Sequence, residues 1–296
     1  MGLRQLPEFE YVAPKEVGEV CSLLQRHETN AQVLAGGTDL LVSMKQRSRS
    51  PRYVIGLKQV PDLDRLSYQD KEALRLGPLV THQILVEDPV IRKRFGGLWT
   101  ACSKIGTPQI RNMGTVGGNL CNGSPSADCA PPLIAFQAVV KVIGVKGERS
   151  LPLEEFFLGP GKTALQAGEI LIEIVVPCPP SRSGLVYVKL PARTAVDIAA
   201  VGVAAYITLD GKNEVCRDVR IVMGAVAPTP IRSRKAEEIL KGQKVREAVI
   251  QKAAQIASEE ARPISDVRSS AAYRKEMVSV LTKQAIEQAL AQAKSA

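Results

Sequence analysis

The sequence has no C-x-x-C pair, only two histidines and no long hydrophobic run. Its cysteines stand at positions 21, 102, 121, 129, 178 and 216, so we expect neither a dense disulfide framework nor a zinc or iron–sulfur site with closely spaced ligands. The longest weakly polar run, residues 198–209, is too short to cross a bilayer, and the first residues lack the apolar segment of a signal peptide. These absences predict a cytoplasmic protein with reduced thiols and no membrane span.

Aromatic residues are scarce as well, with one Trp, six Tyr and five Phe among 296 residues. The formal net charge is +9, and residues 231–296 hold 13 Lys and Arg against 8 Asp and Glu. A basic protein can bind nucleic acid, but no basic run alternates with the aromatic side chains on which bases stack. We therefore expect no nucleic-acid partner; a non-enzymatic binding module is an alternative that rests on this charge alone. The composition, 45% hydrophobic and 23% charged, excludes wholesale disorder.

The hydrophobic pattern predicts an α/β half of about 180 residues followed by strands and then helices, an order typical of an α+β domain. The predicted helices of the first half are 14–27, 38–47, 81–95 and 98–105, and its strands are 31–37, 52–57, 73–78, 138–144 and 169–177. Residues 107–132, rich in glycine and proline, are predicted to be mostly loop, and the proline-rich residues 177–184 a linker. Three β-rich runs follow, and the chain turns helical from Thr229.

Two glycine-rich segments carry most of the chemical information. Residues 35–41 (AGGTDLL) follow a predicted strand, and residues 114–120 (GTVGGNL) lie in the predicted loop. Glycine lets the backbone approach a ligand closely, and successive N–H groups in such turns form a concavity that suits phosphate. Thr38 and Thr115 add hydroxyl groups. Neither segment matches the Rossmann or P-loop fingerprint. Together they predict a pyrophosphate held between them, with tight turns that bind nothing as the alternative.

The sequence resembles the FAD-binding medium subunits of the molybdenum hydroxylases, the xanthine dehydrogenase, aldehyde oxidase and carbon monoxide dehydrogenase family. The motifs that carry the resemblance are AGGTDLL (35–41), IGTPQIRNMGTVGGNL (105–120), SPSAD (124–128), GEIL (168–171) and KLPARTAVDIAAV (189–201). The resemblance implies an α+β fold: a vanillyl-alcohol-oxidase-type (PCMH-type) FAD-binding domain over 1–178, with lobes of about 1–57 and 58–178. A small C-terminal α+β domain of the carbon monoxide dehydrogenase flavoprotein type, a three-stranded antiparallel sheet plus helices, is expected over 184–296.

The resemblance also implies which residues contact FAD. They are Val33, Leu34, Ala35, Gly36, Gly37, Thr38, Asp39, Leu40, Ile105, Gly106, Ile110, Gly114, Thr115, Gly118, Asn119, Asn122, Asp128, Ile170, Leu171 and Lys189. Within this set the two glycine segments are expected at the pyrophosphate, and Ile170 and Leu171 as an apolar wall. Asp128 is expected near the adenosine portion and Lys189 near the isoalloxazine, where a positive charge would favour reduced, anionic flavin.

Each of the later assignments has an alternative. Ile170 and Leu171 could be plain core residues, Asp128 could cap the helix that follows it, and Lys189 could be a solvated strand residue. The sequence also departs from the family: residues 192–194 are Ala-Arg-Thr where many relatives have two adjacent arginines, which weakens any inference of a second basic contact.

Several features of the family's chemistry are missing from the chain. It has no cysteine-rich insertion, so no iron–sulfur cluster is expected here, and Cys121 with Cys129 lacks the further ligands that a metal needs. Neither His27 nor His82 lies in a glycine segment, so FAD should be noncovalent. We find no catalytic acid, base or metal constellation.

The leading hypothesis is therefore an electron-transfer subunit that holds FAD and passes electrons between [2Fe-2S] clusters and an external acceptor. Molybdopterin and the clusters are expected only on partners, a molybdopterin-binding large subunit and a small subunit with two [2Fe-2S] clusters, in a dimer of heterotrimers. The alternative is a self-sufficient FAD-dependent oxidoreductase of the same superfamily, which would need its own substrate acid or base.

Overall fold

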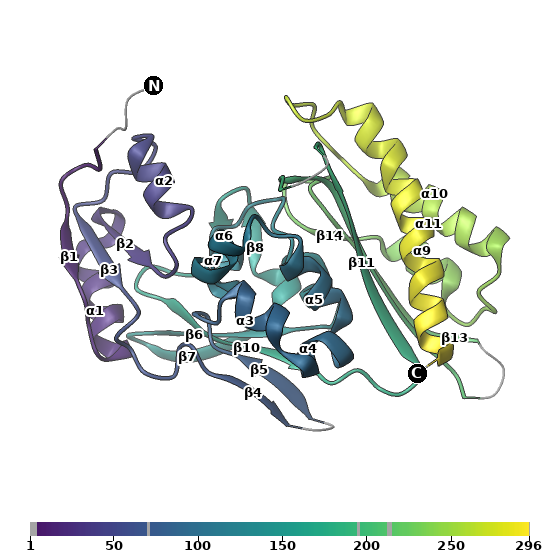
Figure 1. Ribbon diagram of the computed structural model, residues 1–296, viewed down its shortest axis with the longest axis horizontal. Helices are drawn as coiled ribbons and strands as arrows, with labels where there is room; N and C mark the ends of the chain where they lie inside the picture. The colour runs from purple at the N-terminus through teal and green to yellow at the C-terminus, as the bar shows by residue number, and fades with distance from the viewer. Residues whose placement is uncertain (1–4, 70–71, 194–195, 212–214, 296) are drawn as a thin grey trace.

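A computed structural model describes residues 5–69, 72–193, 196–211 and 215–295; residues 194–195 of the KLPARTAVDIAAV motif lie outside it. Its three parts follow one another along the long axis of the molecule, each built on its own sheet (Figure 1). No helix in these described ranges is both long and apolar enough to span a bilayer.

The first part is a three-stranded parallel sheet with helices beside it. Strands β1 (Glu10–Val12), β3 (Tyr53–Gly56) and β2 (Ala31–Leu34) lie in that order. Helix α1 (Val17–His27), the 3₁₀ turn η1 (Glu28–Asn30) and α2 (Leu40–Lys45) connect the strands. Helix α1 buries Val20 and Cys21 against the sheet. The connection from β2 to α2 is thus a short, glycine-containing turn at the carboxyl end of a strand.

The second part is a five-stranded antiparallel sheet with a helical layer. The strands lie in the order β4 (Leu66–Gln69), β5 (Ala73–Leu76), β10 (Ile170–Pro177), β6 (Val139–Gly144) and β7 (Gly147–Pro152). The connection from β7 to β10 contains η2 (Leu153–Glu155), β8 (Phe157–Gly159) and β9 (Lys162–Thr163). The helices are α3 (His82–Glu87), α4 (Pro89–Arg94), α5 (Gly96–Ser103), α6 (Pro108–Met113), α7 (Val116–Cys121) and α8 (Ala130–Ala135).

Two predictions for this helical layer are wrong. The single helix predicted over 81–95 is broken at Asp88, whose carboxylate accepts hydrogen bonds from the N–H groups of Val90 and Ile91 (2.8 and 2.9 Å) and so begins a new helix at Pro89. Residues 107–132, predicted to be mostly loop, contain α6, α7 and the first half of α8. Threonine caps and first-turn prolines permit these six-residue helices, and packing stabilises them, since every residue of α8 is buried.

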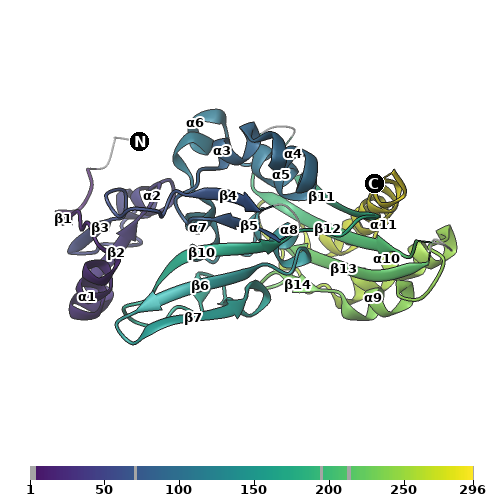
Figure 2. The ribbon, with the colours of Figure 1, turned by 90° about the horizontal axis from the view of Figure 1, so that it is seen from below.

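The third part is an antiparallel sheet covered by helices. Strands β11 (Ser183–Pro191), β12 (Ala199–Leu209) and β13 (Cys216–Gly224) are joined by a fourth, two-residue strand β14 (Ile231–Arg232), so the sheet has one strand more than predicted. Helices α9 (Arg234–Leu240), α10 (Glu247–Glu260) and α11 (Ala271–Ser295) pack on one face. The opposite face meets α5 and α8 of the second part (Figure 2).

One hydrophobic core joins the second and third parts. Leu185 and Tyr187 of β11 and Tyr206 of β12 belong to the same buried cluster as the helices of the second part. At Gly97 of α5, an added Cβ would collide with the Leu185 side chain, so the helix and the strand are in close contact. This packing fixes the third part against the second and makes it a wall of the cleft described next.

Candidate cofactor cleft

A single large cleft is bordered by all three parts of the molecule. Its volume is about 1430 Å³, larger than the roughly 300–1,000 Å³ of a typical small-molecule pocket, so it suits an extended ligand. Its walls come from residues 24–40 of the first part, from segments 105–128 and 165–171 of the second, and from residues 189–198 and 267–268 of the third, as far as these are described.

The first glycine segment leaves its backbone donors free. It forms the turn between β2 and α2, and Gly37 has φ +79°, a left-handed conformation that favours glycine. No hydrogen bond in the described ranges of the chain uses the N–H of Gly36, Gly37, Thr38 or Asp39. Successive free N–H groups at the border of a cleft are the donors that a phosphate needs.

The second glycine segment differs from the prediction. The Thr115 hydroxyl accepts the N–H of Gly118 (3.0 Å) as the cap of α7, and the N–H groups of Val116 and Gly117 donate to carbonyls within residues 78–80 (2.9 and 3.0 Å). These donors serve the fold, so this segment does not offer the predicted run of free N–H groups. It contributes backbone atoms that border the cleft, together with the Thr115 hydroxyl, which can still donate its own proton.

The two segments touch each other. A Cβ on Gly36 would collide with the backbone carbonyl of Met113 and come within 3.1 Å of the Gly114 Cα. The buried Oδ1 of Asn119 has no hydrogen-bond partner in the described part of the chain and belongs to a residue that lines the cleft. A buried acceptor without a donor is costly, and the hydroxyl groups of a nucleotide's sugar chain are donors that would satisfy it. The close backbones and the unpaired acceptor therefore fit a dinucleotide.

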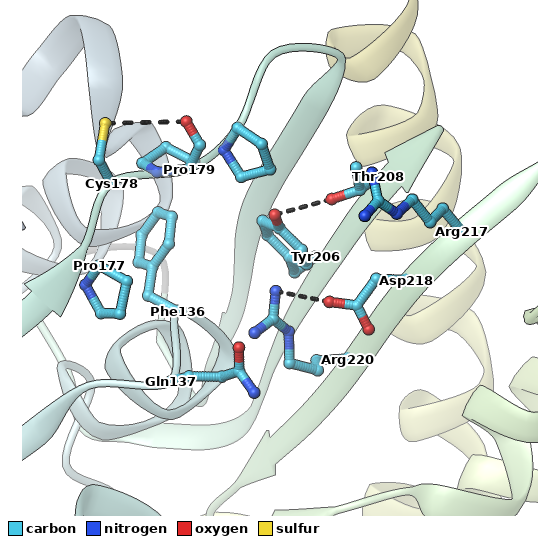
Figure 3. Close-up of a pocket in the computed structure, with 11 residues that line it drawn as sticks. Phe136, Gln137, Pro177, Cys178, Pro179, Tyr206, Thr208, Arg217, Asp218 and Arg220 are labelled. Carbon is cyan, nitrogen blue, oxygen red and sulfur yellow. Dashed lines mark hydrogen bonds and ion pairs between the residues drawn. The ribbon is translucent and has the colours of Figure 1, made fainter. Parts of the chain in front are cut away.

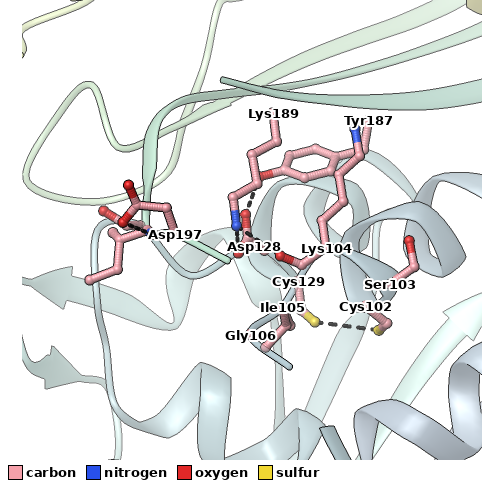
Figure 4. Close-up of polar contacts among 12 residues, drawn as sticks. Cys102, Ser103, Lys104, Ile105, Gly106, Asp128, Cys129, Tyr187, Lys189 and Asp197 are labelled. Atoms are coloured by element: carbon pink, nitrogen blue, oxygen red, sulfur yellow. Dashed lines mark hydrogen bonds and ion pairs between the residues drawn. The ribbon is translucent and has the colours of Figure 1, made fainter. Parts of the chain in front are cut away.

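A buried ion pair lies in the same cleft (Figure 4). The Lys189 Nζ donates to Asp128 Oδ2 (2.8 Å) and to the Lys104 carbonyl (3.0 Å), and the Tyr187 hydroxyl donates to Asp128 Oδ1 (2.7 Å). The side chains of Lys189 and Asp128 are 4% and 9% exposed. Burial raises the pKa of the Asp128 carboxyl, and the neighbouring Lys189 opposes that shift. Burial also lowers the pKa of Lys104, and the charge of Lys189 adds to that shift.

This network changes three sequence-based interpretations. Asp128 caps no helix, since α8 is preceded by Cys129 and has no side-chain cap, and Lys189 is not solvated. The two residues were assigned to opposite ends of FAD, yet they are in direct contact, so both assignments cannot hold. The charge of Lys189 is largely neutralised by Asp128, so the pair, rather than a lone cation, faces the cleft.

The predicted site residues come together almost completely. Every one of them except Leu34 lines the cleft, including Ile170 and Leu171, which are also buried in the core. Leu34 instead packs beside the small cluster of Leu40, Met44 and Val54. The fold brings the remaining residues together from four separate segments, 33–40, 105–128, 170–171 and position 189.

Other residues of the cleft were missed by sequence reasoning. They include Pro78, Leu79, His82, Gly117, Ser124, Ser126, Ala127, Gln166, Ala167, Gly168, Glu169, Arg193, Asp197 and Arg268. Ser124, Ser126 and Gly168 stand inside motifs that were recognised, whereas Arg268 has no local signal. Arg111 does not line the cleft but positions residues that do. Its Nη1 donates to the carbonyls of Ser103, Ile105 and Gly106 (3.3, 3.3 and 3.4 Å), which holds the turn at residues 103–106 beside the cleft.

An ion pair fixes another border of the cleft. Arg149 donates to Glu169 through Nε (2.8 Å) and Nη2 (2.7 Å), and the Gln166 N–H donates to the same carboxylate (2.7 Å). Mainly because of the Arg149 hydrogen bonds, the pKa of Glu169 is lowered. The fold therefore favours the ionised form of Glu169. The stability that the ionised carboxylate contributes is complete above the pKa of Glu169 in the unfolded chain and is lost as pH falls through its pKa in the folded chain.

Glu169→Gln should therefore lower the free energy of unfolding at pH 7 by about 1 kcal/mol, a value that allows for solvent screening at the partly exposed Arg149. The difference from the unsubstituted chain should shrink in acid, below about pH 4. Chemical denaturation at several pH values measures both effects. Glu287→Gln, which removes an exposed partner of Lys283 at 3.8 Å, should change stability by less than about 0.5 kcal/mol. Equal effects of the two substitutions would contradict the role of the Arg149 pair.

A second, smaller cavity lies at the junction of β10 with the third part (Figure 3). Its volume is about 310 Å³, and Phe136, the prolines at 177, 179 and 180, and Tyr206 are among its lining residues. Arg220 lies over the Tyr206 ring, 3.9 Å from its centroid, and pairs with Asp218 at 3.0 Å. None of the predicted cofactor residues borders this cavity, so the large cleft is the candidate site.

Comparison with known proteins places the chain in one family over nearly its full length. Residues 7–179 match the family described as FAD binding domain in molybdopterin dehydrogenase, and residues 186–289 match the CO dehydrogenase flavoprotein C-terminal domain. The chain is 34% identical to the carbon monoxide dehydrogenase medium chain of Hydrogenophaga pseudoflava, covering 96% of this chain and 98% of that one. It is 33% identical to the putative xanthine dehydrogenase FAD-binding subunit of Escherichia coli K12, covering 89% and 90%. A solved structure of the Hydrogenophaga pseudoflava enzyme superposes with a TM-score of 0.93 at 34% identity, covering 97% and 99%.

Proposed function

The chain belongs to the family of FAD-binding medium subunits of the molybdenum hydroxylases, and on that premise we propose how it holds its cofactor and with what it assembles. It is the FAD-containing electron-transfer subunit of a molybdenum-, iron–sulfur- and flavin-containing hydroxylase or dehydrogenase. When bound, FAD supplies the electron-carrying chemistry that links the [2Fe-2S] clusters of a partner subunit to an external acceptor.

The free N–H groups of residues 36–39 bind the pyrophosphate, with the Thr115 hydroxyl as a further donor from the opposite segment. The observation that supports this most directly is the contact between the two glycine segments at Gly36 and Met113, which brings both backbones to the same point of the cleft. Asn119 Oδ1 accepts from a sugar-chain hydroxyl of FAD. Neither glycine segment contains a histidine or a cysteine before Cys121, and we expect binding to be noncovalent.

The Lys189–Asp128 pair lies at the isoalloxazine end of the bound cofactor. Lys189 stands on β11 in the third part, whereas residues 24–32 belong to the first part, and the second part lies between the two (Figure 1). Residues of the first part and segment 165–169, which line the same cleft, would then hold the adenosine. This proposal keeps the expectation that Lys189 lies near the isoalloxazine. It moves Asp128 from the adenosine portion to the isoalloxazine end.

The partners are a molybdopterin-binding large subunit and a small subunit with two [2Fe-2S] clusters, in a dimer of heterotrimers in the cytoplasm. The division of the chain at about 1–178 and 184–296 corresponds to the cofactor domain and the domain that closes it. Three of the carboxylates that line the cleft, Asp128, Glu169 and Asp197, are paired with basic side chains, which disfavours a self-sufficient oxidoreductase.

The test is to purify the chain alone and together with the products of its neighbouring genes. The isolated chain should release FAD, not FMN, on acid precipitation, and should oxidise no organic substrate. Co-expression should give a larger species on a sizing column that carries iron and molybdenum as well as flavin. Substrate oxidation by the monodisperse chain, free of iron–sulfur clusters, would instead support a self-sufficient flavoenzyme, and a chain that cannot be loaded with FAD would contradict the site.

A further inference from the structure

Behind the second glycine segment, three potential metal ligands meet although they are far apart in the sequence. They are His82 at the start of α3, Cys102 in α5 and Cys129 just before α8. One ligand atom of each lies within 4.8 Å of the other two, and all three residues are buried, with exposures of 2%, 0% and 0%. We call these three residues the HCC cluster. Sequence spacing predicted no metal site, because no two of them are close in the chain.

Two of the three ligand–ligand distances within the HCC cluster are close to those of a metal site. Cys102 Sγ lies 3.7 Å from Cys129 Sγ, and Cys129 Sγ lies 3.8 Å from His82 Nδ1. With zinc–sulfur bonds of about 2.3 Å and zinc–nitrogen bonds of about 2.0 Å at tetrahedral angles, two sulfurs stand about 3.8 Å apart and a sulfur and a nitrogen about 3.5 Å apart. The third pair, Cys102 and His82, lies within 4.8 Å, so a rotation of these side chains toward the centre would let the cluster bind one ion.

The chemistry of the ligands selects the ion. Two thiolates and an imidazole are soft ligands that favour zinc-class cations over magnesium or calcium. In a buried place a neutral assembly costs least. Two thiolates with a divalent cation and a neutral imidazole carry no net charge, whereas a monovalent cation would leave one negative charge buried. The nearby charges of Asp128 and Lys189 already neutralise each other.

From this geometry we infer that the HCC cluster is a binding site for one zinc-class divalent cation, with His82 Nδ1, Cys102 Sγ and Cys129 Sγ as ligands. The other edge of the imidazole faces the glycine segment: an added Cβ on Gly114 would lie 3.2 Å from His82 Cδ2. The ion thus lies directly behind the cofactor cleft and fixes His82 under it. No fourth Cys, His, Asp or Glu ligand joins the cluster in the described part of the chain, so the fourth position belongs to a small ligand such as water, as in other zinc sites with three protein ligands.

The test uses the full chain, produced without a histidine tag in zinc-supplemented cells and purified without chelator, because a buried site is loaded as the chain folds. Elemental analysis should find about one zinc per chain, and the Cys102→Ser/Cys129→Ser double variant should hold at least five-fold less. The matched control is Cys21→Ser/Cys216→Ser, which replaces two buried thiols outside the cluster and should keep the metal.

A second measurement stands even if the double variant fails to fold. X-ray absorption at the zinc edge of the unsubstituted chain should show two sulfur ligands and one imidazole nitrogen. Equal zinc in the unsubstituted chain and the double variant, zinc bound only through oxygen or nitrogen, or a chain that holds no zinc would overturn the site. In those cases the three side chains are a hydrogen-bonded part of the core. None of these readouts depends on FAD, so the test separates this site from the proposed function.

Discussion

Gly118→Val should give a folded chain that no longer retains FAD. An added Cβ at this position would meet a single heavy atom within 4 Å, Thr115 Oγ1 at 2.9 Å, and is otherwise in open space. Gly118 lines the cleft, so the valine side chain would extend into the cleft rather than into the core. We expect at least a 100-fold loss of FAD affinity, equivalent to about 2.7 kcal/mol, measured by flavin fluorescence or calorimetry on the cofactor-free chain.

The control for this substitution is Gly18→Val. Gly18 is also a helical glycine, and an added Cβ there would meet nothing within 4 Å, but it lies in α1 and does not line the cleft. This variant should bind FAD normally, and circular dichroism should be the same for both variants. Normal flavin content in the Gly118 variant would mean that the glycine pair is a tight turn and that the pyrophosphate lies elsewhere.

Lys189→Met should destabilise the chain more than removal of a surface charge does. The substitution leaves the Asp128 carboxylate buried, with the Tyr187 hydroxyl as its remaining partner among those found for it. Breaking a buried ion pair by removing one partner costs about 3–5 kcal/mol, because the other charge is left uncompensated. We expect a loss of that size in the free energy of unfolding of the cofactor-free chain, measured by chemical denaturation so that FAD binding does not contribute.

The double variant Lys189→Met/Asp128→Asn distinguishes two contributions to the lost stability: loss of the ion pair itself, and burial of the Asp128 carboxylate without a counter-ion. It removes the carboxylate together with its partner, so it should recover part of the stability that Lys189→Met alone loses. If both variants are destabilised equally, packing of the lysine chain and not the ion pair accounts for the effect. A loss below about 1 kcal/mol in the single variant would mean that water reaches Asp128 and that the pair is not buried in solution.

The sequence predicted those features of the fold that depend on neighbouring residues. The helix at Val17–His27 and the strands at Val139–Gly144 and Ile170–Pro177 were recognised from periodicity, within three residues of their observed ends. The six-residue helices between 107 and 135 were not, because helices this short owe their stability to packing and carry too few residues for a periodic signal. The break at Asp88 was missed, although an Asp-Pro pair is a sequence signal for a new helix start.

In the site, too, local features could be predicted from the sequence and contacts between distant residues could not. The glycine segments could be located from the sequence, but the use of the Val116, Gly117 and Gly118 N–H groups by the fold could not, since their acceptors depend on the turn before α3 and the cap of α7. Partners distant in sequence were equally hidden. Asp128 and Lys189 are 61 positions apart, so neither residue alone predicts the other as its counter-ion.

The continuous core between α5, α8 and β11 has a consequence for how this family can diversify. Leu185 is in contact with α5 at Gly97, and the Ala225 N–H donates to the Pro125 carbonyl (2.7 Å). The contact between the second and third parts thus depends on specific residue pairs. A gene exchange that replaced only the C-terminal segment would join two surfaces that had not evolved together. Recombination that keeps the protein folded would have to transfer α5, α8 and β11 together. The boundary between the two matched family domains, 7–179 and 186–289, nevertheless separates α5 and α8 from β11.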